Sequence, residues 1–202
     1  MTKPPPAPKP RYNLENAQVL LVEDNQRGLD ITYKLLQGLG VRSIERAPTA
    51  FVAKDLLKSR EFDLMICEAA LEGSDGYDLV HWLRRAKLTP NSFMAAIILC
   101  GHSPMSKVAK ARDCGADFII TRPLTPKILL DRIIWVARDS RSFVECQVYL
   151  GPDRRFHSIG PPPGTDGRRW DDLPLEVGEP SGHNLDQSDI DAMLNPRRTP
   201  RT

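Results

Sequence analysis

The sequence predicts an α/β protein with a flavodoxin-like, doubly wound sheet of five parallel strands and helices on both of its faces. Short apolar runs of strand length alternate with amphipathic segments of helix length across residues 17–139. The first run, residues 19–22, is apolar at every position, as expected of a strand that is buried on both faces. Alternation of this kind favours parallel strands, because a crossover helix returns the chain to the same end of the sheet.

The first half of the pattern contains three strands and two helices. The first strand leads to a helix at about 26–39, which repeats leucines on one face and is ended by Gly40. A weak strand at 43–46 precedes a helix at about 48–60, and the third strand follows at 64–67. The positions expected to face the core from these two helices are Leu29, Leu36, Leu39, Ala53, Leu56 and Leu57.

The second half contains two more strands and three helices. Asp75 is expected to cap a helix that runs to about residue 86. A strand at 95–99, a helix at about 104–114 and a strand at 116–120 come next, and Thr125 then opens a last helix. Ligands of such sheets bind at the carboxyl ends of the strands. The candidate functional residues are therefore those at the strand ends: Glu23, Asp24, Glu68, Cys100, Thr121 and Arg122.

Composition and charge exclude several classes of protein. The net charge of +2 offers no bulk attraction for nucleic acid or a membrane surface. No apolar stretch approaches the ~20 residues that span a bilayer, and the first residues lack the apolar core of a signal peptide. We therefore expect a cytoplasmic protein. The four cysteines show no C-x-x-C spacing, which favours buried free thiols over a zinc site.

Prolines mark the segments outside the domain. Eighteen prolines are too many for one compact unit of this size, and they gather near both ends. Residues 143–150 are expected to add a short strand. The predicted organisation is a disordered proline-rich arm at 1–14, the α/β domain at 17–139, a linker at 140–183, a short amphipathic helix at 184–195 and a disordered end at 196–202.

Glu68 and the turn that follows it carry the most specific signal. Glu68 ends a strand, and the turn Gly73-Ser74-Asp75-Gly76 then leads into a helix. This order resembles the phosphorylation segment of response-regulator receiver domains, and the resemblance extends over residues 17–139. In that family the acid is an aspartate, which accepts a phosphoryl group from a histidine kinase. The resemblance implies that Glu68 stands at the phosphoacceptor position.

The resemblance also assigns the other strand ends. It implies that Glu23 and Asp24 match the acidic pair that holds Mg²⁺ in the family, a hard cation that prefers oxygen ligands. Three positions depart from the family pattern. Cys100 replaces a serine or threonine, Arg122 replaces the lysine of a Lys-Pro pair that keeps its Pro123, and Ile119 replaces a switching aromatic.

These departures indicate a receiver that works without phosphate and requires no cofactor. A glutamate cannot easily reproduce the in-line geometry of phosphotransfer, and small displacements cost heavily. Arg122 is expected to pair bidentately with Glu68 and to hold the site in one state. Two alternatives stay open: a decayed site on a docking scaffold, and a competent receiver that acts as an inefficient phosphate sink.

A short segment near the end of the chain resembles a known partner peptide. Its sequence, Leu-Asp-Gln-Ser-Asp-Ile-Asp-Ala-Met-Leu, is similar to the N-terminal peptide of the flagellar switch protein, which binds the phosphorylated chemotaxis regulator. Its apolar positions, expected to contact a partner, are Leu185, Ile190, Met193 and Leu194. This implies capture of a chemotaxis or flagellar regulator in trans. Docking in cis on the face of the domain's fourth helix, fifth strand and fifth helix, or a chance match, are the alternatives.

Two arginine clusters lie in the predicted linker, at Arg154 and Arg155 and at Arg168 and Arg169. They are candidates for binding an anion or a nucleotide, and a solvated linker is the alternative. The tail lacks two helices joined by a tight turn, so no DNA-binding output domain is expected. The predicted function is thus an atypical, non-enzymatic response regulator that acts through protein contacts.

Overall fold

The computed structural model describes residues 12–101, 105–139, 141–146, 149–153 and 187. A parallel sheet of five strands forms its centre, in the order β2-β1-β3-β6-β7. This order confirms the predicted doubly wound fold. The strands are β1 (Gln18–Val22), β2 (Ser43–Ala47), β3 (Leu64–Glu68), β6 (Ala95–Cys100) and β7 (Phe118–Thr121).

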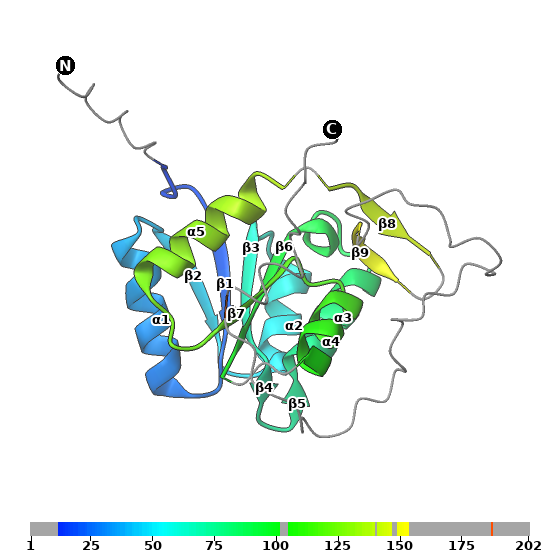
Figure 1. Ribbon diagram of the computed structural model, residues 1–202, viewed down its shortest axis with the longest axis horizontal. Helices are drawn as coiled ribbons and strands as arrows, with labels where there is room; N and C mark the ends of the chain where they lie inside the picture. Colours follow the sequence, from blue (N-terminus) through cyan, green and yellow to red (C-terminus); the bar gives the residue numbers. More distant parts are fainter. Residues whose placement is uncertain (1–11, 102–104, 140, 147–148, 154–186, 188–202) are drawn as a thin grey trace, which may run out of the picture.

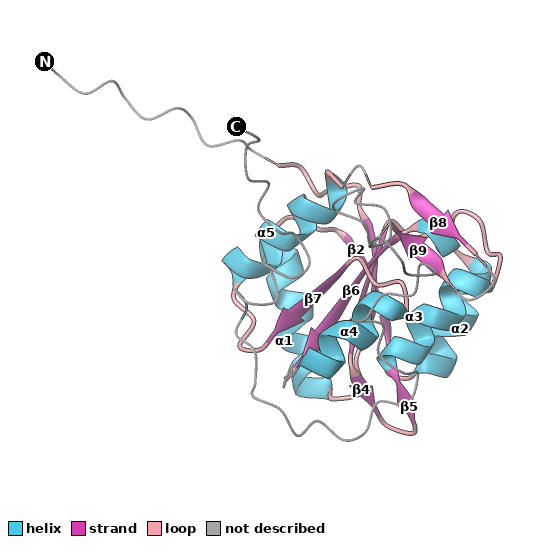
Figure 2. Ribbon diagram, turned by 45° about the vertical axis from the view of Figure 1, so that its right-hand side comes forward, coloured by secondary structure: helices cyan, strands magenta, loops and turns pink. Residues whose placement is uncertain are grey.

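Helices cover both faces of this sheet (Figures 1 and 2). One face carries α1 (Gln26–Gly38) and α5 (Pro126–Ala137). The other carries α2 (Ala50–Ser59), α3 (Gly76–Arg85) and α4 (Met105–Asp113), with a short 3-10 turn at Asn91–Phe93 before β6. The three-layer arrangement explains why the central strands read as continuous apolar runs, since a helix lies over each of their faces.

The two residues that were predicted to begin helices, Asp75 and Thr125, cap them in the structure. Asp75 accepts a hydrogen bond from the Tyr77 amide at the start of α3, and Thr125 accepts one from the Ile128 amide at the start of α5. α1 is capped in the same way by Asn25. Because the five strands of the sheet are parallel, the loops that carry Glu23, Glu68 and Arg122 lie at one end of the sheet.

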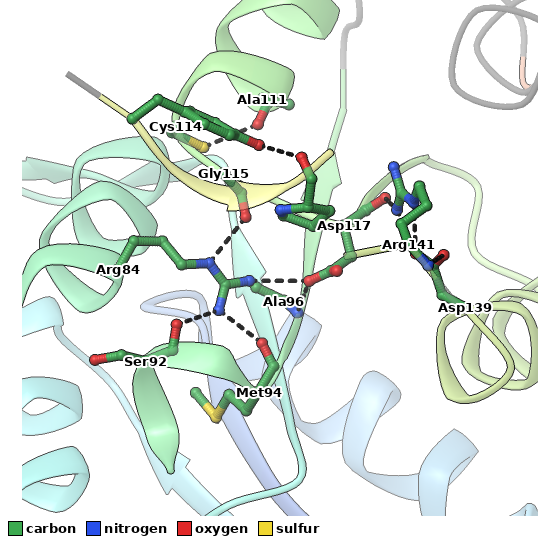
Figure 3. Close-up of polar contacts among 12 residues, drawn as sticks. Arg84, Ser92, Met94, Ala96, Ala111, Cys114, Gly115, Asp117, Asp139 and Arg141 are labelled. Atoms are coloured by element: carbon green, nitrogen blue, oxygen red, sulfur yellow. Dashed lines mark hydrogen bonds and ion pairs between the residues drawn. The ribbon is translucent and has the colours of Figure 1, made fainter. Parts of the chain in front are cut away.

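A buried arginine organises the opposite end of the sheet (Figure 3). Arg84 of α3 is 1% exposed, and its guanidinium donates to the carbonyls of Gly115, Ser92 and Met94 at 2.9, 3.0 and 2.7 Å. It also pairs with Asp117, whose Oδ2 lies 2.9 Å from Nη2. A buried charge is tolerated only when it is paired and hydrogen-bonded, and the guanidinium of Arg84 is both. The sequence pattern did not predict the burial of this arginine.

The chain after α5 differs from the prediction. A single strand was expected at 143–150, followed by linker, but the structure has an antiparallel hairpin of β8 (Phe143–Glu145) and β9 (Leu150–Pro152). The Phe143 ring lies 5.0 Å from the Arg84 guanidinium, so the hairpin packs over the buried network. A second small hairpin, β4 (Ala70–Leu71) with β5 (Ser74–Asp75), forms the turn after β3.

Three of the four cysteines, Cys67, Cys100 and Cys114, are buried thiols as predicted, whereas Cys146 is exposed. Burial raises the pKa of Cys114 to about 12, which keeps this thiol protonated and unreactive. Within the described ranges, no helix is long and apolar enough to cross a membrane.

Candidate functional site

The carboxyl ends of β1, β3 and β7 bring three charged side chains together. Glu23 follows β1, Glu68 ends β3, and Arg122 follows β7. These residues lie far apart in the sequence, and they meet because the carboxyl ends of parallel strands share one edge of the sheet.

Arg122 bridges the two glutamates. Its Nη2 lies 2.9 Å from Oε1 of Glu23 and 2.8 Å from Oε2 of Glu68, and its Nε lies 3.3 Å from the same Glu68 oxygen. The expected pairing of Arg122 with Glu68 is therefore present, but both nitrogens address one oxygen. The predicted bidentate pairing with both oxygens of Glu68 does not form, and Nη2 also binds Glu23.

Glu23 is the most enclosed member of this triad. Its side chain is 3% exposed, against 14% for Glu68 and 29% for Arg122. Burial raises the pKa of the Glu23 carboxyl, and the attraction of Arg122 opposes that rise. Among the described residues, Oε2 of Glu23 finds no hydrogen-bond partner. The charge on Glu23 thus depends on Arg122.

A glycine makes room for Glu23. A Cβ atom on Gly28 in α1 would lie 1.6 Å from Oε1 of Glu23, so only glycine is compatible with the present position of this carboxylate. Since Gly28 lies in a helix, where glycine costs stability, its presence is explained by this close approach. Gly28 was not among the predicted site residues, although a glycine in the first turns of a helix after an acidic strand end is a usable signal.

Glu68 is held from its other side. Its Oε1 accepts a hydrogen bond from the Ala69 amide at 3.2 Å. Gly76 at the start of α3 approaches so closely that a Cβ there would lie 2.1 Å from the Glu68 carbonyl oxygen. The Glu68 side chain therefore contacts the amide of Ala69 with one oxygen and Arg122 with the other.

Asp24 does not join the triad. Its Oδ2 accepts a hydrogen bond from the amide of Glu72, in the turn between β4 and β5. The arrangement does not fit Mg²⁺, because the guanidinium of Arg122 already contacts both Glu23 and Glu68 and Asp24 is engaged elsewhere. The described residues contain no group of three or more His, Cys, Asp or Glu arranged to hold a metal.

Of the other residues expected at the site, Cys100 and Ile119 lie in the core, whereas Pro123 does not. Cys100 is 1% exposed, and its sulfur lies 4.0 Å from the hydroxyl of Tyr77. Burial, and then the neighbouring Cys100, raise the pKa of Tyr77 far above its ordinary range. Ile119 is fully buried in the core. Pro123 is exposed and follows a cis peptide bond with Arg122.

Several predicted residues lie outside the described residues. They are the tail positions Leu185, Ile190, Met193 and Leu194 and the cluster positions Arg154, Arg155, Arg168 and Arg169. Within the tail motif, the structure does describe Gln187, which contacts the backbone of β7. Gln187 belongs to the quoted motif, but partner contacts were predicted for the apolar positions of that motif alone.

Comparison with known proteins shows which family this chain matches. The family model described as the response regulator receiver domain matches residues 19–134, which is more than half of the chain. The transcriptional regulatory protein YvrH of Bacillus subtilis is 28% identical over 120 residues, or 59% of this chain. The chemotaxis protein CheY-3 of Vibrio cholerae is 22% identical over 119 residues, which cover 59% of this chain and 90% of the relative.

Solved structures show the same fold. A putative response regulator from Chloroflexus aurantiacus J-10-fl superimposes with a TM-score of 0.56 and 25% identity, covering 60% of this chain and 98% of that one. A CheY-like receiver domain protein from Methanospirillum hungatei JF-1 has a TM-score of 0.53 at 24% identity, covering 59% of this chain and 91% of that one. The chain spans 48% of the length of YvrH, so about half of that relative has no counterpart in the match.

Proposed function

Because the chain belongs to the response regulator receiver family of two-component signalling, we propose that it is a receiver whose state does not depend on phosphorylation. Arg122, bound to Glu23 and Glu68 at once, carries this proposal. In this proposal, the ion pairs of Arg122 set the state of the domain, as phosphoryl transfer does in the family. The domain then signals by contact with other proteins.

Charge balance supports this proposal. Two carboxylates at one strand edge repel each other, and a cation between them offsets that repulsion. An incoming phosphoryl group would add negative charge to a site whose cation is already engaged by two partners. It would also have to separate Arg122 from Glu68, which would leave a partly buried charge without its partner.

The length of the side chain supports it as well. Glu68 extends one methylene further than an aspartate and is held at both oxygens, by Ala69 and by Arg122. A misplacement of about 1 Å can lower the rate of a chemical step roughly 100-fold. Cys100, at the position where the family has a hydroxyl, points at Tyr77 and supplies no strong donor.

The partners proposed for this receiver are proteins. A histidine kinase, or a regulator of chemotaxis or flagellar motility, follows from the family and from the tail motif around Gln187. Similarity to the chemotaxis protein CheY-3 supports the motility branch of this proposal.

A phosphorylation assay tests the proposal. The full chain is incubated with radiolabelled acetyl phosphate and Mg²⁺, or with a histidine kinase and radiolabelled ATP. A receiver that carries the phosphoacceptor aspartate is the positive control. We expect no stable label on this chain. The matched variant, Glu68→Asp with Arg122→Lys and Cys100→Thr, restores the family's residues and should gain label. Stable label on the native chain that is lost in Glu68→Ala would instead identify a phosphate sink.

A further inference from the structure

The outer edge of β7 is occupied by a residue from far along the chain. β7 is the last strand in the sheet order, so one of its edges pairs with β6 and the other has no neighbouring strand among the described residues. On that outer edge, the side-chain oxygen of Gln187 accepts from the amide of Thr121 at 2.9 Å and from its hydroxyl at 3.1 Å. The side-chain nitrogen of Gln187 donates to the carbonyl of Ile119 at 3.3 Å.

The geometry matches what an added strand would use. Arg122 directs its amide toward β6, where the Cys100 carbonyl accepts it at 2.9 Å. Backbone groups alternate in direction along a strand, so Ile119 and Thr121 present theirs to the outer edge. A carboxamide places a carbonyl acceptor beside an N–H donor, as a peptide unit does, and Gln187 uses both as one residue of a sixth strand would.

We propose that the outer edge of β7 is a docking site for a carboxamide-bearing peptide, and that its occupant is this chain's own segment 184–195, held through Gln187. The contact joins residues 66 and 68 positions apart, so it is not a by-product of local chain geometry. An exposed strand edge invites pairing with another chain, and a segment docked on it blocks that pairing. Gln187 therefore occupies the edge at which another strand would have to pair.

The same contact connects the edge to the charged triad. Thr121 binds Gln187, and the next residue, Arg122, binds Glu23 and Glu68. Displacing the segment would act on the residue next to the ion pairs. The docking proposal itself does not depend on phosphate independence, because it rests on the hydrogen bonds of Gln187 to Ile119 and Thr121.

Amide hydrogen exchange of the full chain tests this docking. In the native protein the Thr121 amide should be protected, and Gln187→Ala should accelerate its exchange up to about tenfold, as expected when one hydrogen bond is removed. The Arg122 amide, which bonds to Cys100, is the internal reference and should be unaffected. The matched control Gln37→Ala removes an exposed glutamine whose bond goes to Tyr33 on α1, and it should behave like the native protein.

A peptide added in trans identifies the occupant. A synthetic 184–195 peptide should restore protection of Thr121 in the Gln187→Ala chain, whereas the same peptide with alanine at position 187 should not. In the native chain, protection should be independent of protein concentration. Equal exchange at Thr121 in the native chain and in Gln187→Ala would overturn the proposal. Protection that increases with protein concentration would assign the edge to a second copy and would also overturn docking in cis.

Discussion

Replacing Arg122 by methionine should destabilise the folded protein by about 2–4 kcal/mol at neutral pH. Methionine keeps much of the side-chain volume but removes the charge and all of its hydrogen bonds. The variant leaves Glu23, which is 3% exposed, without its one ion-pair partner among the described residues. It also leaves Glu68 facing a like charge.

The magnitude follows from the hydrogen bonds that methionine cannot make. Arg122 makes one hydrogen bond to Glu23 at 2.9 Å and two to Glu68 at 2.8 and 3.3 Å. A hydrogen bond to a charged group contributes about 1.5–3 kcal/mol to the free energy of unfolding. The full value applies best to Glu23, because its Oε2 already lacks a partner among the described residues. The two bonds to Glu68 count for less, since water can reach its 14% exposed side chain.

The destabilisation should depend on pH. Burial raises the pKa of Glu23 above its ordinary value of 4.5, so the folded protein binds this proton more tightly than the unfolded chain does. The corresponding contribution to stability is present below the unfolded pKa and is lost as the pH rises through the folded pKa. Without Arg122 the folded pKa rises further. The defect of Arg122→Met should therefore be largest at neutral pH and should shrink as the pH falls toward 4.5.

Urea unfolding followed by circular dichroism at two pH values measures this effect. Adding Glu23→Gln to Arg122→Met should recover part of the stability at neutral pH, because it removes the unpaired buried charge. Arg42→Met is the matched control, since Arg42 pairs with Glu15 at the surface and is 73% exposed; it should cost at most about 1 kcal/mol. A destabilisation below about 0.5 kcal/mol, or one that does not change with pH, would refute the reasoning.

Three further variants, one of them a control, test the surroundings of the site and the far end of the sheet. Gly28→Ala should destabilise the protein by about 1–3 kcal/mol by displacing the Glu23 carboxylate, although alanine favours helices. Gly38→Ala in the same helix, where a Cβ meets nothing within 4 Å, should be neutral or stabilising by up to about 1 kcal/mol. Arg84→Met should cost about 3–5 kcal/mol, because it leaves Asp117 buried without this ion pair. Thermal unfolding compares all three, and a Gly28 variant as stable as the Gly38 variant would contradict the proposed close contact.

Much of the fold could be predicted because local patterns dictate it. The apolar run of β1 and the caps at Asp75 and Thr125 are properties of a few neighbouring residues. The meeting of Glu23, Glu68 and Arg122 was also predictable, since parallel strands share their carboxyl ends. The sequence could not predict that Arg122 binds both glutamates, because the direction of a side chain depends on the packing around it.

Other features carry no local signal. Arg84 lies in an amphipathic helix and reads like a solvent-exposed charge, but the chain around Gly115 and Met94 folds over it. The hairpin of β8 and β9 was predicted as one strand followed by linker, because a strand of three residues is too short for periodicity to reveal.

The sequence by itself determined the doubly wound fold and the receiver family, and it predicted that Glu68 stands at the phosphoacceptor position. The tertiary structure alone decided that Arg122 binds Glu23 as well as Glu68. It also decided that Asp24 accepts a hydrogen bond from Glu72 and that Gln187 contacts the outer edge of β7. Periodicity and capping involve residues that are close together in the chain, so the sequence alone predicts them. Ion pairs and edge contacts join residues many positions apart, and their geometry exists only once the sheet and its helices are packed.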